Sequence, residues 1–502
     1  MFTAKTKEAF PFLGHPQLAR AGWWMLLGLA TLGLGWLIVR GRGPLAAGAF
    51  IFAILYLSIL ARWQRGIYGL LIYLPFSGVV TLALYPWKGL PALNPILYKD
   101  WLFVLPAYAG FLGWIVLRRE RPPRVGPLTG GLFLAFALLV VAQMANPGVP
   151  NALVALIGAK VWLLYLPLYV LTLALIASRR HLVFLMRLLV GGAAVPCAVG
   201  IAEFVSAQFL GYQAVMDAIY GAVGAEATQG FTRFEVGEGF IARIPSTFTF
   251  VAQYFSFTLA MLAPCYALWR VDPSFRWRRL AYGVLTLAGV AAFLSGARAA
   301  FVCVPLLLGM MYALDRGFPG LLRACLYAGG VLVAALAVSR VAVTPLFEYV
   351  SELFRNYVPE TIRAVVQTVA NSPLGNGTGT NTGPARYALE RPELFTAIEN
   401  YHAKIAHELG IPGLLLLWTL LGVFIGQGLR ARRRLADPAL RAVAAAFTSF
   451  IIILVIYSLK GWFIDLDPLN VYFWMFAAVL AKLPALDSGP GGLSPAPAEE
   501  RS

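Results

Sequence analysis

The sequence predicts an all-α polytopic membrane protein with about 12–14 transmembrane helices. Two observations predict this fold class. Of the 502 residues, 60% are hydrophobic and only 13% are charged, whereas a soluble domain averages about 25% charged residues because water must wet its surface. Apolar runs of about 20 residues, the length that crosses a bilayer, also recur along the whole chain. We therefore expect lipid to be part of the solvent of this protein.

The apolar runs define the expected domain organisation. Fourteen runs are candidate spans, at about residues 22–40, 44–61, 67–85, 99–117, 127–145, 152–177, 184–206, 246–269, 279–296, 299–315, 321–343, 411–429, 442–459 and 468–483. No cleavage pattern follows the first run, so we expect a retained helix there. The prediction is a cytoplasmic segment over residues 1–21, a transmembrane domain over residues 22–484, and a disordered cytoplasmic tail over residues 485–502.

The placement of basic residues predicts the orientation. Basic residues cluster at Arg62/Arg65, Arg118/Arg119/Arg121/Arg124, Arg179/Arg180, Arg270/Arg276/Arg278/Arg279, Arg316/Arg323 and Arg430/Arg432/Arg433/Arg434. With the N-terminus inside, every cluster falls on the cytoplasmic side, as the positive-inside rule requires. Two long loops, residues 207–245 and 344–410, then face outward, and we expect them to form a helical cap over the membrane surface. A shorter outward loop covers residues 86–98.

Composition also argues against several kinds of site. The net charge is +17, but the basic residues lie in short clusters between apolar runs and form no stripe with interleaved aromatic residues, so we expect no nucleic-acid partner. The four cysteines lie in apolar segments without C-x-x-C spacing. We therefore expect neither a disulfide framework nor a zinc site.

Cationic residues on the predicted outer side are the first candidate site residues. Arg298 lies in a break of small residues between two apolar runs, and Arg243 stands at the mouth of the next span. Arg355 and Arg363 belong to a predicted loop helix over residues 352–371 and are spaced to share one face. Lys160 lies near the outer end of a span. Each suits an anionic substrate. The alternatives are a structural ion pair for Arg298, a solvated face for the loop arginines and snorkelling for Lys160.

A glycine-rich segment follows the loop helix. It reads Ser-Pro-Leu-Gly-Asn-Gly-Thr-Gly-Thr over residues 372–380. Gly375 and Gly377 would let backbone amides approach a phosphate or a sugar. Glycine-rich turns are common, however, and the Gly-Lys-Ser/Thr ending of a P-loop is missing.

The densest group of polar residues spans Glu399 to Gly410. If this segment is helical, Glu399 and His402 lie on one face, with His407 beside them. A carboxylate and an imidazole suit proton abstraction from a hydroxyl. The pattern H-E-x-x-H is absent, so we expect no metal site. An amphipathic interfacial helix is the alternative.

These segments together resemble the bacterial O-antigen ligase/O-antigen polymerase superfamily of polytopic membrane glycosyltransferases. The resemblance covers about residues 155–480. It rests on the Ser-Gly-Ala-Arg break at 295–298, on the arginine-bearing loop that runs into Pro-Leu-Gly-Asn-Gly at 373–377, and on Glu399-Asn400-Tyr401 followed by Glu-Leu-Gly-Ile-Pro-Gly at 408–413.

The resemblance implies a GT-C-like, metal-independent and cofactor-free enzyme of the bacterial inner membrane. Such enzymes take a glycan from an undecaprenyl-diphosphate-linked donor and transfer it, with inversion, to a glycan or glycolipid acceptor on the periplasmic or outer face. Arginines hold the diphosphate, which implies this role for Arg298 and Arg355, supported by Arg243 or Arg363. Asn400 and Tyr401 become secondary site residues.

One departure from the family pattern leaves the base open between two residues. In the ligases the third segment tends to begin His-Asn, whereas this chain has Glu399 before Asn400 and places His402 three residues later. The departure favours a polysaccharide polymerase of the O-antigen or exopolysaccharide type. The alternatives are an O-antigen ligase with a lipid A core acceptor, and a flippase or transporter of lipid-linked oligosaccharide.

Overall fold

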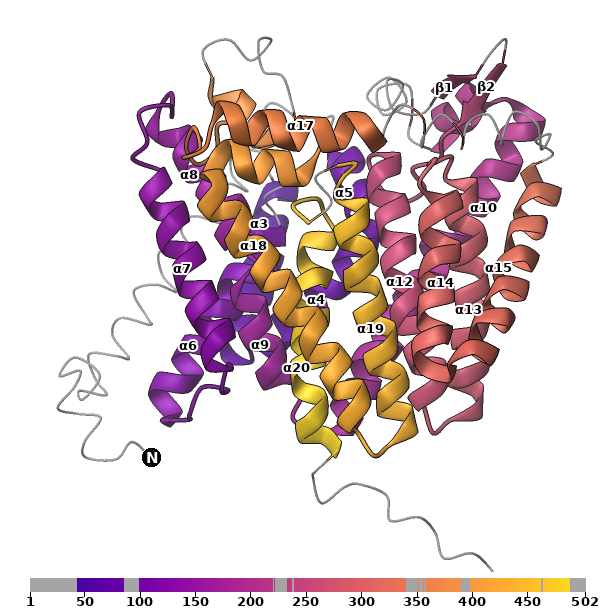
Figure 1. Cartoon of the computed structure of the whole chain (residues 1–502), viewed down its shortest axis with the longest axis horizontal. Coiled ribbons are helices and arrows are strands. Elements are labelled where there is room, and N and C mark those ends of the chain that lie inside the picture. Colours follow the sequence, from indigo (N-terminus) through magenta and orange to yellow (C-terminus); the bar gives the residue numbers. More distant parts are fainter. Residues whose placement is uncertain are drawn as a thin grey trace, which may run out of the picture. The chain divides into compact units, whose positions relative to one another are not determined.

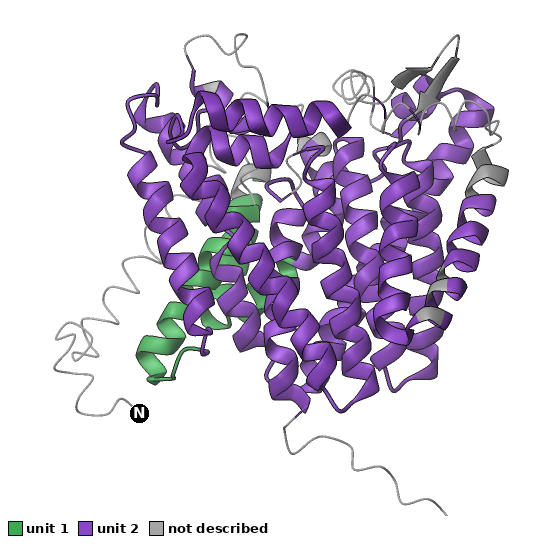
Figure 2. Ribbon diagram, in the orientation of Figure 1, with its two compact units in different colours: residues 1–70, 91–122 green, residues 71–90, 123–502 purple. Residues whose placement is uncertain are grey.

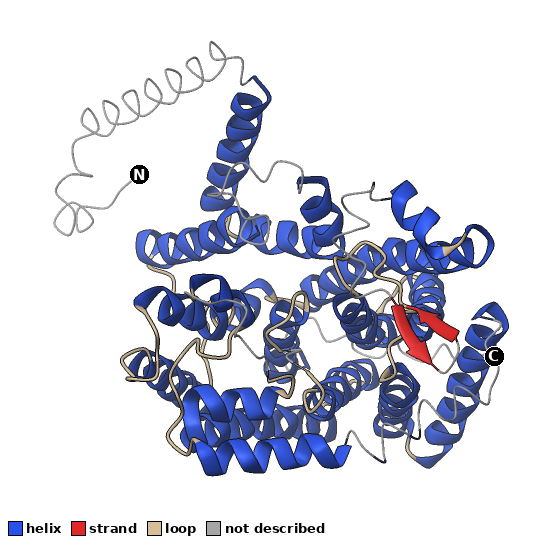
Figure 3. Cartoon of the chain, turned by 90° about the horizontal axis from the view of Figure 1, so that it is seen from above, coloured by secondary structure: helices blue, strands red, loops and turns tan. Residues whose placement is uncertain are grey.

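The computed structural model describes residues 43–84, 99–219, 221, 233–236, 239–339, 351, 355, 358–389, 398–461 and 464–487. These residues are mostly helical, with one short antiparallel hairpin in which Arg233 pairs with Ala242 (Figure 3). The predicted segments 1–21, 22–40 and 86–98 lie outside the described residues.

Figure 1 labels the helices and strands and colours them along the sequence. In chain order they are α3 (Gly43–Ala61), α4 (Gln64–Tyr73), η2 (Leu74–Phe76), α5 (Ser77–Leu84), η5 (Asp100–Val104), α6 (Leu105–Arg118), α7 (Pro127–Gln143), α8 (Ala152–Leu163), α9 (Pro167–Leu175), α10 (Arg179–Leu210), β1 (Arg233–Val236), β2 (Gly239–Ala242), α12 (Val251–Val271), α13 (Phe275–Leu294), α14 (Ala300–Arg316), α15 (Phe318–Ser339), α17 (Val358–Asn371), η7 (Gly383–Ala388), α18 (Tyr401–Arg434), α19 (Pro438–Tyr457) and α20 (Leu469–Asp487).

The described residues confirm a polytopic helical membrane protein. Seven helical stretches are long and apolar enough to cross a membrane: Asp100–Arg118 (η5 with α6), Ala152–Leu175 (α8 with α9), Arg179–Leu210, Val251–Val271, Tyr401–Arg434, Pro438–Tyr457 and Leu469–Asp487. Shorter apolar helices cover Ala47–Ala61, Pro127–Gln143 and Cys325–Ala334. α20 extends to Asp487, into the segment predicted to be a tail, and the rest of that tail lies outside the described residues.

Prolines explain where two predicted runs divide. The run 152–177 consists of α8 and α9, because α9 begins at Pro167, a residue that suits the first position of a helix but removes a hydrogen bond from its interior. The run 67–85 is likewise interrupted by the short 3-10 turn η2, which contains Pro75.

The chain divides into two compact units (Figure 2). Unit 1 comprises residues 1–70 and 91–122. Within its described part α3 packs against α6, and Gly110 permits their close approach, since a Cβ there would lie 2.8 Å from the carbonyl oxygen of Leu60. The rings of Trp63 and Phe111 meet edge to face, with centroids 5.0 Å apart.

Unit 2 comprises residues 71–90 and 123–502 and is built around α12. α12 packs against α10, α13, α14 and α19, and 89% of its most apolar window is buried. It is therefore surrounded by protein, whereas α8 and α18 also expose apolar residues such as Leu156 and Leu415. An apolar exterior of this kind fits contact with lipid.

The helix ends of unit 2 form two chemically different groups. Ion pairs join the arginine-rich ends of α10, α12, α14 and α19: Arg179–Asp437 at 2.5 Å, Arg187–Asp272 at 2.6 Å and Arg270–Asp315 at 3.1 Å. The opposite ends lie next to Arg243, Arg298 and Glu399, which stand before α12, before α14 and before α18. At that end α17 runs across the ends of α18 and α19 (Figure 1). The gathering of the arginine-rich helix ends at one end of unit 2 agrees with the predicted orientation, in which the basic clusters share one side of the membrane.

Candidate functional site

Arg298 lies in the turn between α13 and α14. The predicted break of small residues is confirmed: α13 ends at Leu294 and α14 begins at Ala300. Gly296 has φ +73°, a conformation that favours glycine. The Ser295 hydroxyl donates to the carbonyl of Ala292 at 2.7 Å. The turn is thus fixed by its own sequence, and it presents Arg298, half-buried, directly before α14.

Arg243 lies beside this turn. The amide of Ile244 donates to the carbonyl oxygen of Ser295 at 3.3 Å, which joins the two arginine-bearing segments. The same segment is anchored twice more: the Ser246 hydroxyl donates to the carbonyl of Pro196 at 2.7 Å, and the Thr247 hydroxyl donates to that of Pro75 at 2.5 Å. The backbone that carries Arg243 is therefore fixed on three sides.

Lys460 is a third cation at the same place, and the sequence analysis did not identify it. It lies half-buried in the turn after α19, where its amide donates to the carbonyl of Tyr457 at 2.9 Å. Burial and the nearby charges of Arg298 and Arg243 lower the pKa of its ammonium to about 8, while Cys303 and Glu399 oppose that shift. The charges of Arg243, Arg298 and Glu399 thus lie near enough to act on Lys460, and we call the four residues the cation cluster.

Glu399 faces this cluster from outside a helix. α18 begins at Tyr401, with Asn400 as its N-cap, so Glu399 precedes the helix and is exposed. The predicted helical face shared by Glu399 and His402 is therefore wrong. The reason is local: the Asn400 side chain accepts hydrogen bonds from the amides of His402 (2.9 Å) and Ala403 (3.1 Å), which is the usual way that asparagine starts a helix.

His402 points into the protein. Its side chain is buried, and both ring nitrogens have partners: Trp418 Nε1 donates to Nδ1 at 3.2 Å, and Nε2 lies 3.2 Å from the carbonyl oxygen of Val455. Because an indole N–H only donates and a carbonyl only accepts, the ring is neutral, with its proton on Nε2. His402 thus joins α18 to α19, and of the two candidate bases only Glu399 is exposed.

The glycine-rich segment is packed against protein. The amide of Asn376 donates to the carbonyl of His407 at 2.7 Å, that of Gly377 to the carbonyl of Glu408 at 3.1 Å, and that of Thr378 to the carbonyl of Gln143 at 3.1 Å. Gly375 and Gly377 have φ +82° and +105°. The predicted approach of backbone amides to a phosphate is not what these glycines provide, because the amides already bind protein oxygens.

Glu408 holds this segment in place. Its buried carboxylate accepts four hydrogen bonds, from the amides of Gly379 and Asn381 (both 2.9 Å), the Thr382 hydroxyl (3.0 Å) and Trp162 Nε1 (2.7 Å). The buried charge is therefore compensated on both oxygens, as burial requires. The sequence analysis named Glu408 only as part of a family motif, without this role.

A buried ion pair lies next to Glu408 and supports the turn that carries Lys460. The Lys404 ammonium binds the Asp465 carboxylate and lies 5.0 Å from the centroid of the Trp162 ring. The amide of Tyr401 donates to the carbonyl of Ser458 at 3.0 Å. Two contacts, at residues 458 and 465, thus tie the segment on either side of Lys460 to the start of α18.

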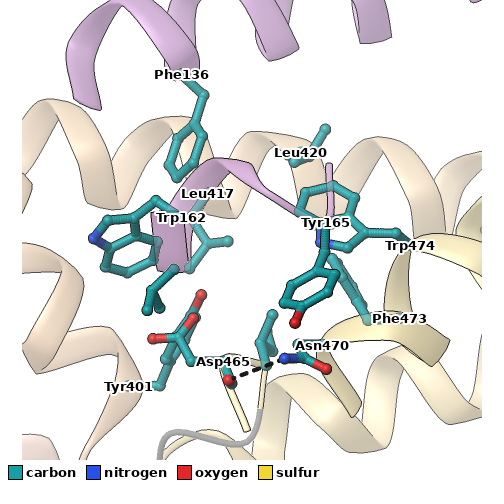
Figure 4. Close-up of a pocket in the computed structure, with 12 residues that line it drawn as sticks. Phe136, Trp162, Tyr165, Tyr401, Leu417, Leu420, Asp465, Asn470, Phe473 and Trp474 are labelled. Carbon is teal, nitrogen blue, oxygen red and sulfur yellow. Dashed lines mark hydrogen bonds between the residues drawn. The ribbon is translucent and has the colours of Figure 1, made fainter. Parts of the chain in front are cut away.

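A small cavity lies beside this ion pair (Figure 4). Aromatic side chains, including Trp162, Tyr165, Tyr401 and Trp474, surround it, and Asn470 donates to the backbone carbonyl of Asp465 at 3.4 Å. Its volume is about 20 Å³, enough for about one water molecule. This cavity is too small for a sugar.

The other predicted site residues lie on different elements. Lys160 is half-buried in α8, Arg363 is exposed on α17, and Arg355 is exposed before it. His407 is half-buried against the glycine-rich segment, with its ring 3.2 Å from Asn376 Nδ2. Asn400 also donates to the carbonyl of Thr361 at 2.9 Å. It therefore fixes α17 to α18.

Among the described residues, no group of three or more His, Cys, Asp or Glu side chains is placed to hold a metal ion. In comparisons with known proteins, no protein-family model matches the chain, and no curated protein shows significant sequence similarity to it.

Proposed function

We propose that this protein is a membrane glycosyltransferase that transfers or polymerises glycan from a polyprenyl-diphosphate-linked donor. One observation carries the proposal: the segments that carry Arg243, Arg298, Lys460 and Glu399 lie at the end of unit 2 opposite the arginine-rich end. The Ile244 amide joins the first two segments through the Ser295 carbonyl, and the Tyr401 amide joins the last two through the Ser458 carbonyl. A soluble protein could use such a cluster for many anions. At the end of a membrane-spanning bundle, a lipid-linked diphosphate has the charge and the location that fit it.

The cations suit the leaving group of this reaction. Arg243 and Arg298 are permanently charged, and a guanidinium can bind two phosphate oxygens through parallel hydrogen bonds. Their backbone segments are held by hydrogen bonds at Ile244 and Ser246, so the backbone that carries both charges is fixed before the substrate arrives. Preorganised charges stabilise a leaving diphosphate more than mobile ones, because little reorganisation accompanies the reaction.

Glu399 suits the role of general base. An acceptor sugar hydroxyl loses its proton to the Glu399 carboxylate while its oxygen attacks C1 of the donor sugar. The new C1–O bond forms as the bond between C1 and the diphosphate oxygen breaks, and the polyprenyl diphosphate leaves with the electron pair. Attack from the face opposite the leaving group inverts C1. The exposed position of Glu399 gives a large acceptor access to the base.

The decisive experiment incubates the purified protein with a polyprenyl-diphosphate oligosaccharide and follows the products on a gel. A ladder of longer glycans supports a polymerase. Transfer only after addition of lipid A core supports a ligase. Arg298→Ala is expected to lower the rate by about 100-fold or more, the usual loss when one charge-stabilising group is removed, and Glu399→Gln by a similar factor.

Arg276→Ala is the matched control. Arg276 is an exposed arginine at the start of α13, the same helix that ends before Arg298, but at the arginine-rich end. It is expected to keep full activity. Activity that survives in both Arg298→Ala and Glu399→Gln would contradict the site assignment. The absence of product with every acceptor, combined with movement of the lipid-linked glycan across vesicles, would favour the transporter alternative.

A further inference from the structure

The helix α17 (Val358–Asn371) has three sides of different chemistry. Successive residues of a helix are turned by about 100° around its axis. The side against the protein is buried or half-buried and comprises Val358, Thr361, Ala364, Val365, Thr368 and Val369. An exposed apolar side comprises Pro359, Ile362, Val366 and Ala370. An exposed polar side comprises Glu360, Arg363, Gln367 and Asn371. A helix between protein and water needs only a buried and a polar side, so the exposed apolar side requires an explanation.

The protein-facing side is fixed to the start of α18. α17 packs against α18, and Asn400 Nδ2 donates to the carbonyl of Thr361 at 2.9 Å. Thr361 is buried, and its hydroxyl donates to the carbonyl of Val358 at 2.8 Å. These contacts fix the rotation of α17 about its axis. Ile362 and Val366 therefore stay 53% and 62% exposed.

The exposed apolar surface continues from α17 onto a membrane-spanning helix. Leu374, in the turn after α17, is 74% exposed. The amide of Ile411 donates to the carbonyl of Pro373 at 2.9 Å, so this turn lies against α18 directly after the kink of that helix. Ile411, Leu415 and Trp418 share one face of α18 and are exposed. They belong to a stretch that is long and apolar enough to cross a membrane, and lipid is the medium that fits this face.

We propose that α17 lies in the membrane interface on the side opposite the arginine-rich helix ends, with Ile362, Val366 and Leu374 in contact with the acyl chains of that leaflet. The apolar side is turned by about 130° from the protein-facing side, and the polar side by about 100° from the apolar one. Each side then meets the medium that suits it: protein, lipid or water. Helices with such a division lie in the plane of the interface, and α17 runs across the helix ends in this way (Figure 1).

The position of α17 sets the level of the membrane surface beside the candidate site. Asn400 links α17 to the start of α18, and Glu399 directly precedes Asn400. Glu399 then lies close to the level of the lipid headgroups, where the diphosphate of a lipid-linked donor is located. This consequence rests on the proposed function, whereas the membrane contact of α17 does not.

Spin labels on two adjacent residues of α17 test the contact. Of the four cysteines only Cys325 is exposed, so the full chain with Cys325→Ser is the background for Val366→Cys and for Gln367→Cys. Both positions are exposed, but they belong to the apolar and the polar side. Leu415→Cys, in the exposed apolar face of α18, is the reference for lipid.

The measurement is made on protein reconstituted into nanodiscs of phosphatidylethanolamine and phosphatidylglycerol. Electron paramagnetic resonance with power saturation compares the collisions of each label with oxygen, which concentrates in lipid, and with a water-soluble nickel chelate. Labels at Val366→Cys and Leu415→Cys are expected to collide more with oxygen, and the label at Gln367→Cys more with nickel. Thermal unfolding of the labelled variants, compared with the background, checks that they remain folded.

Two results would overturn the inference. More nickel than oxygen collisions at Val366→Cys would place the apolar side of α17 in water. Few collisions with either reagent there would show that protein, from this chain or from a partner, covers it. Because the measurement uses no glycan and no diphosphate, either result leaves the proposed glycosyltransferase activity to its own test, and loss of that activity would not affect the membrane contact.

Discussion

Replacement of Glu408 by glutamine tests the structural support of the site. Each carboxylate oxygen of Glu408 accepts two hydrogen bonds: Oε1 from the Asn381 amide and the Thr382 hydroxyl, and Oε2 from Trp162 and the Gly379 amide. Glutamine keeps the shape but replaces one oxygen by an NH₂ group, so two of the four donors would face another donor.

The magnitude follows from the number of lost bonds. A hydrogen bond to a charged group contributes about 1.5–3 kcal/mol, and two are lost, so Glu408→Gln should reduce the free energy of unfolding by about 3–6 kcal/mol. The site is fully buried, and water cannot replace the missing acceptor without local opening. The matched control is Glu120→Gln. Glu120 is exposed after α6, and its replacement should change stability by no more than about 0.5 kcal/mol.

Two measurements check this prediction. Denaturant unfolding in detergent, followed by tryptophan fluorescence, gives the free energy. Hydrogen exchange gives the local effect, because the amides of Gly379 and Asn381 should be protected in wild type and exchange faster in Glu408→Gln. An unchanged free energy together with unchanged protection of both amides would refute the conclusion that Glu408 anchors the glycine-rich segment.

Two further predictions concern the same region. Gly379→Ala should strongly destabilise the protein, because φ is +94° and a Cβ would lie 2.2 Å from the carbonyl oxygen of Val154. Its control, Gly131→Ala in α7, has open space around it and should be neutral or stabilising by up to about 1 kcal/mol. Equal melting temperatures of the two variants would contradict this prediction. Lys404→Met should cost about 3–5 kcal/mol because it leaves the Asp465 carboxylate buried and unpaired. Lys404→Met combined with Asp465→Asn should recover part of that loss, and a double-mutant cycle that gives strictly additive losses would exclude the pairing.

The helices could be predicted from the sequence because the bilayer imposes both composition and length. The run 299–315 corresponds to α14 (Ala300–Arg316), and the run 442–459 corresponds to α19 (Pro438–Tyr457). The division between α8 and α9 was not predicted, since apolar residues continue through the break and hydropathy does not register the backbone effect of Pro167.

The sequence could predict only those site residues that are charged and lie on the predicted outer side of the membrane. Arg243, Arg298 and Glu399 stood out as charged residues on the predicted outer side. Lys460 meets the same criterion but lies at the end of a long apolar run, where a lysine has the ordinary explanation of snorkelling. His402 was assigned to a face with Glu399 because the helix was assumed to include residue 399. The capping side chain of Asn400 is the sequence signal that places the start of the helix two residues later.

The glycine-rich segment shows why a pattern can predict a backbone shape and leave its partner open. Glycines at 375, 377 and 379 adopt positive φ, and such a backbone lets amides approach an anion closely. For the Gly379 amide this anion is the carboxylate of Glu408, which lies in the same chain about 30 residues later, whereas the amides of Gly375 and Gly377 donate to backbone carbonyls. A sequence alone does not distinguish an internal carboxylate from the phosphate of a ligand, since both satisfy the same amides.

The buried charges therefore stabilise the backbone, and the exposed charges that this backbone carries are the candidates for binding a substrate. Glu408 and the Lys404–Asp465 pair are compensated within the protein, so they have no charge left for a substrate, but they fix the start of α18 and the segment 458–465. Lys460 lies within that segment and Glu399 lies directly before α18. If the pair is broken, Lys460 and Glu399 lose a common support, and binding of a diphosphate should weaken although neither residue of the pair touches it. If Lys404→Met bound farnesyl diphosphate, a short-chain polyprenyl diphosphate, with wild-type affinity, the cation cluster would not depend on the Lys404–Asp465 pair.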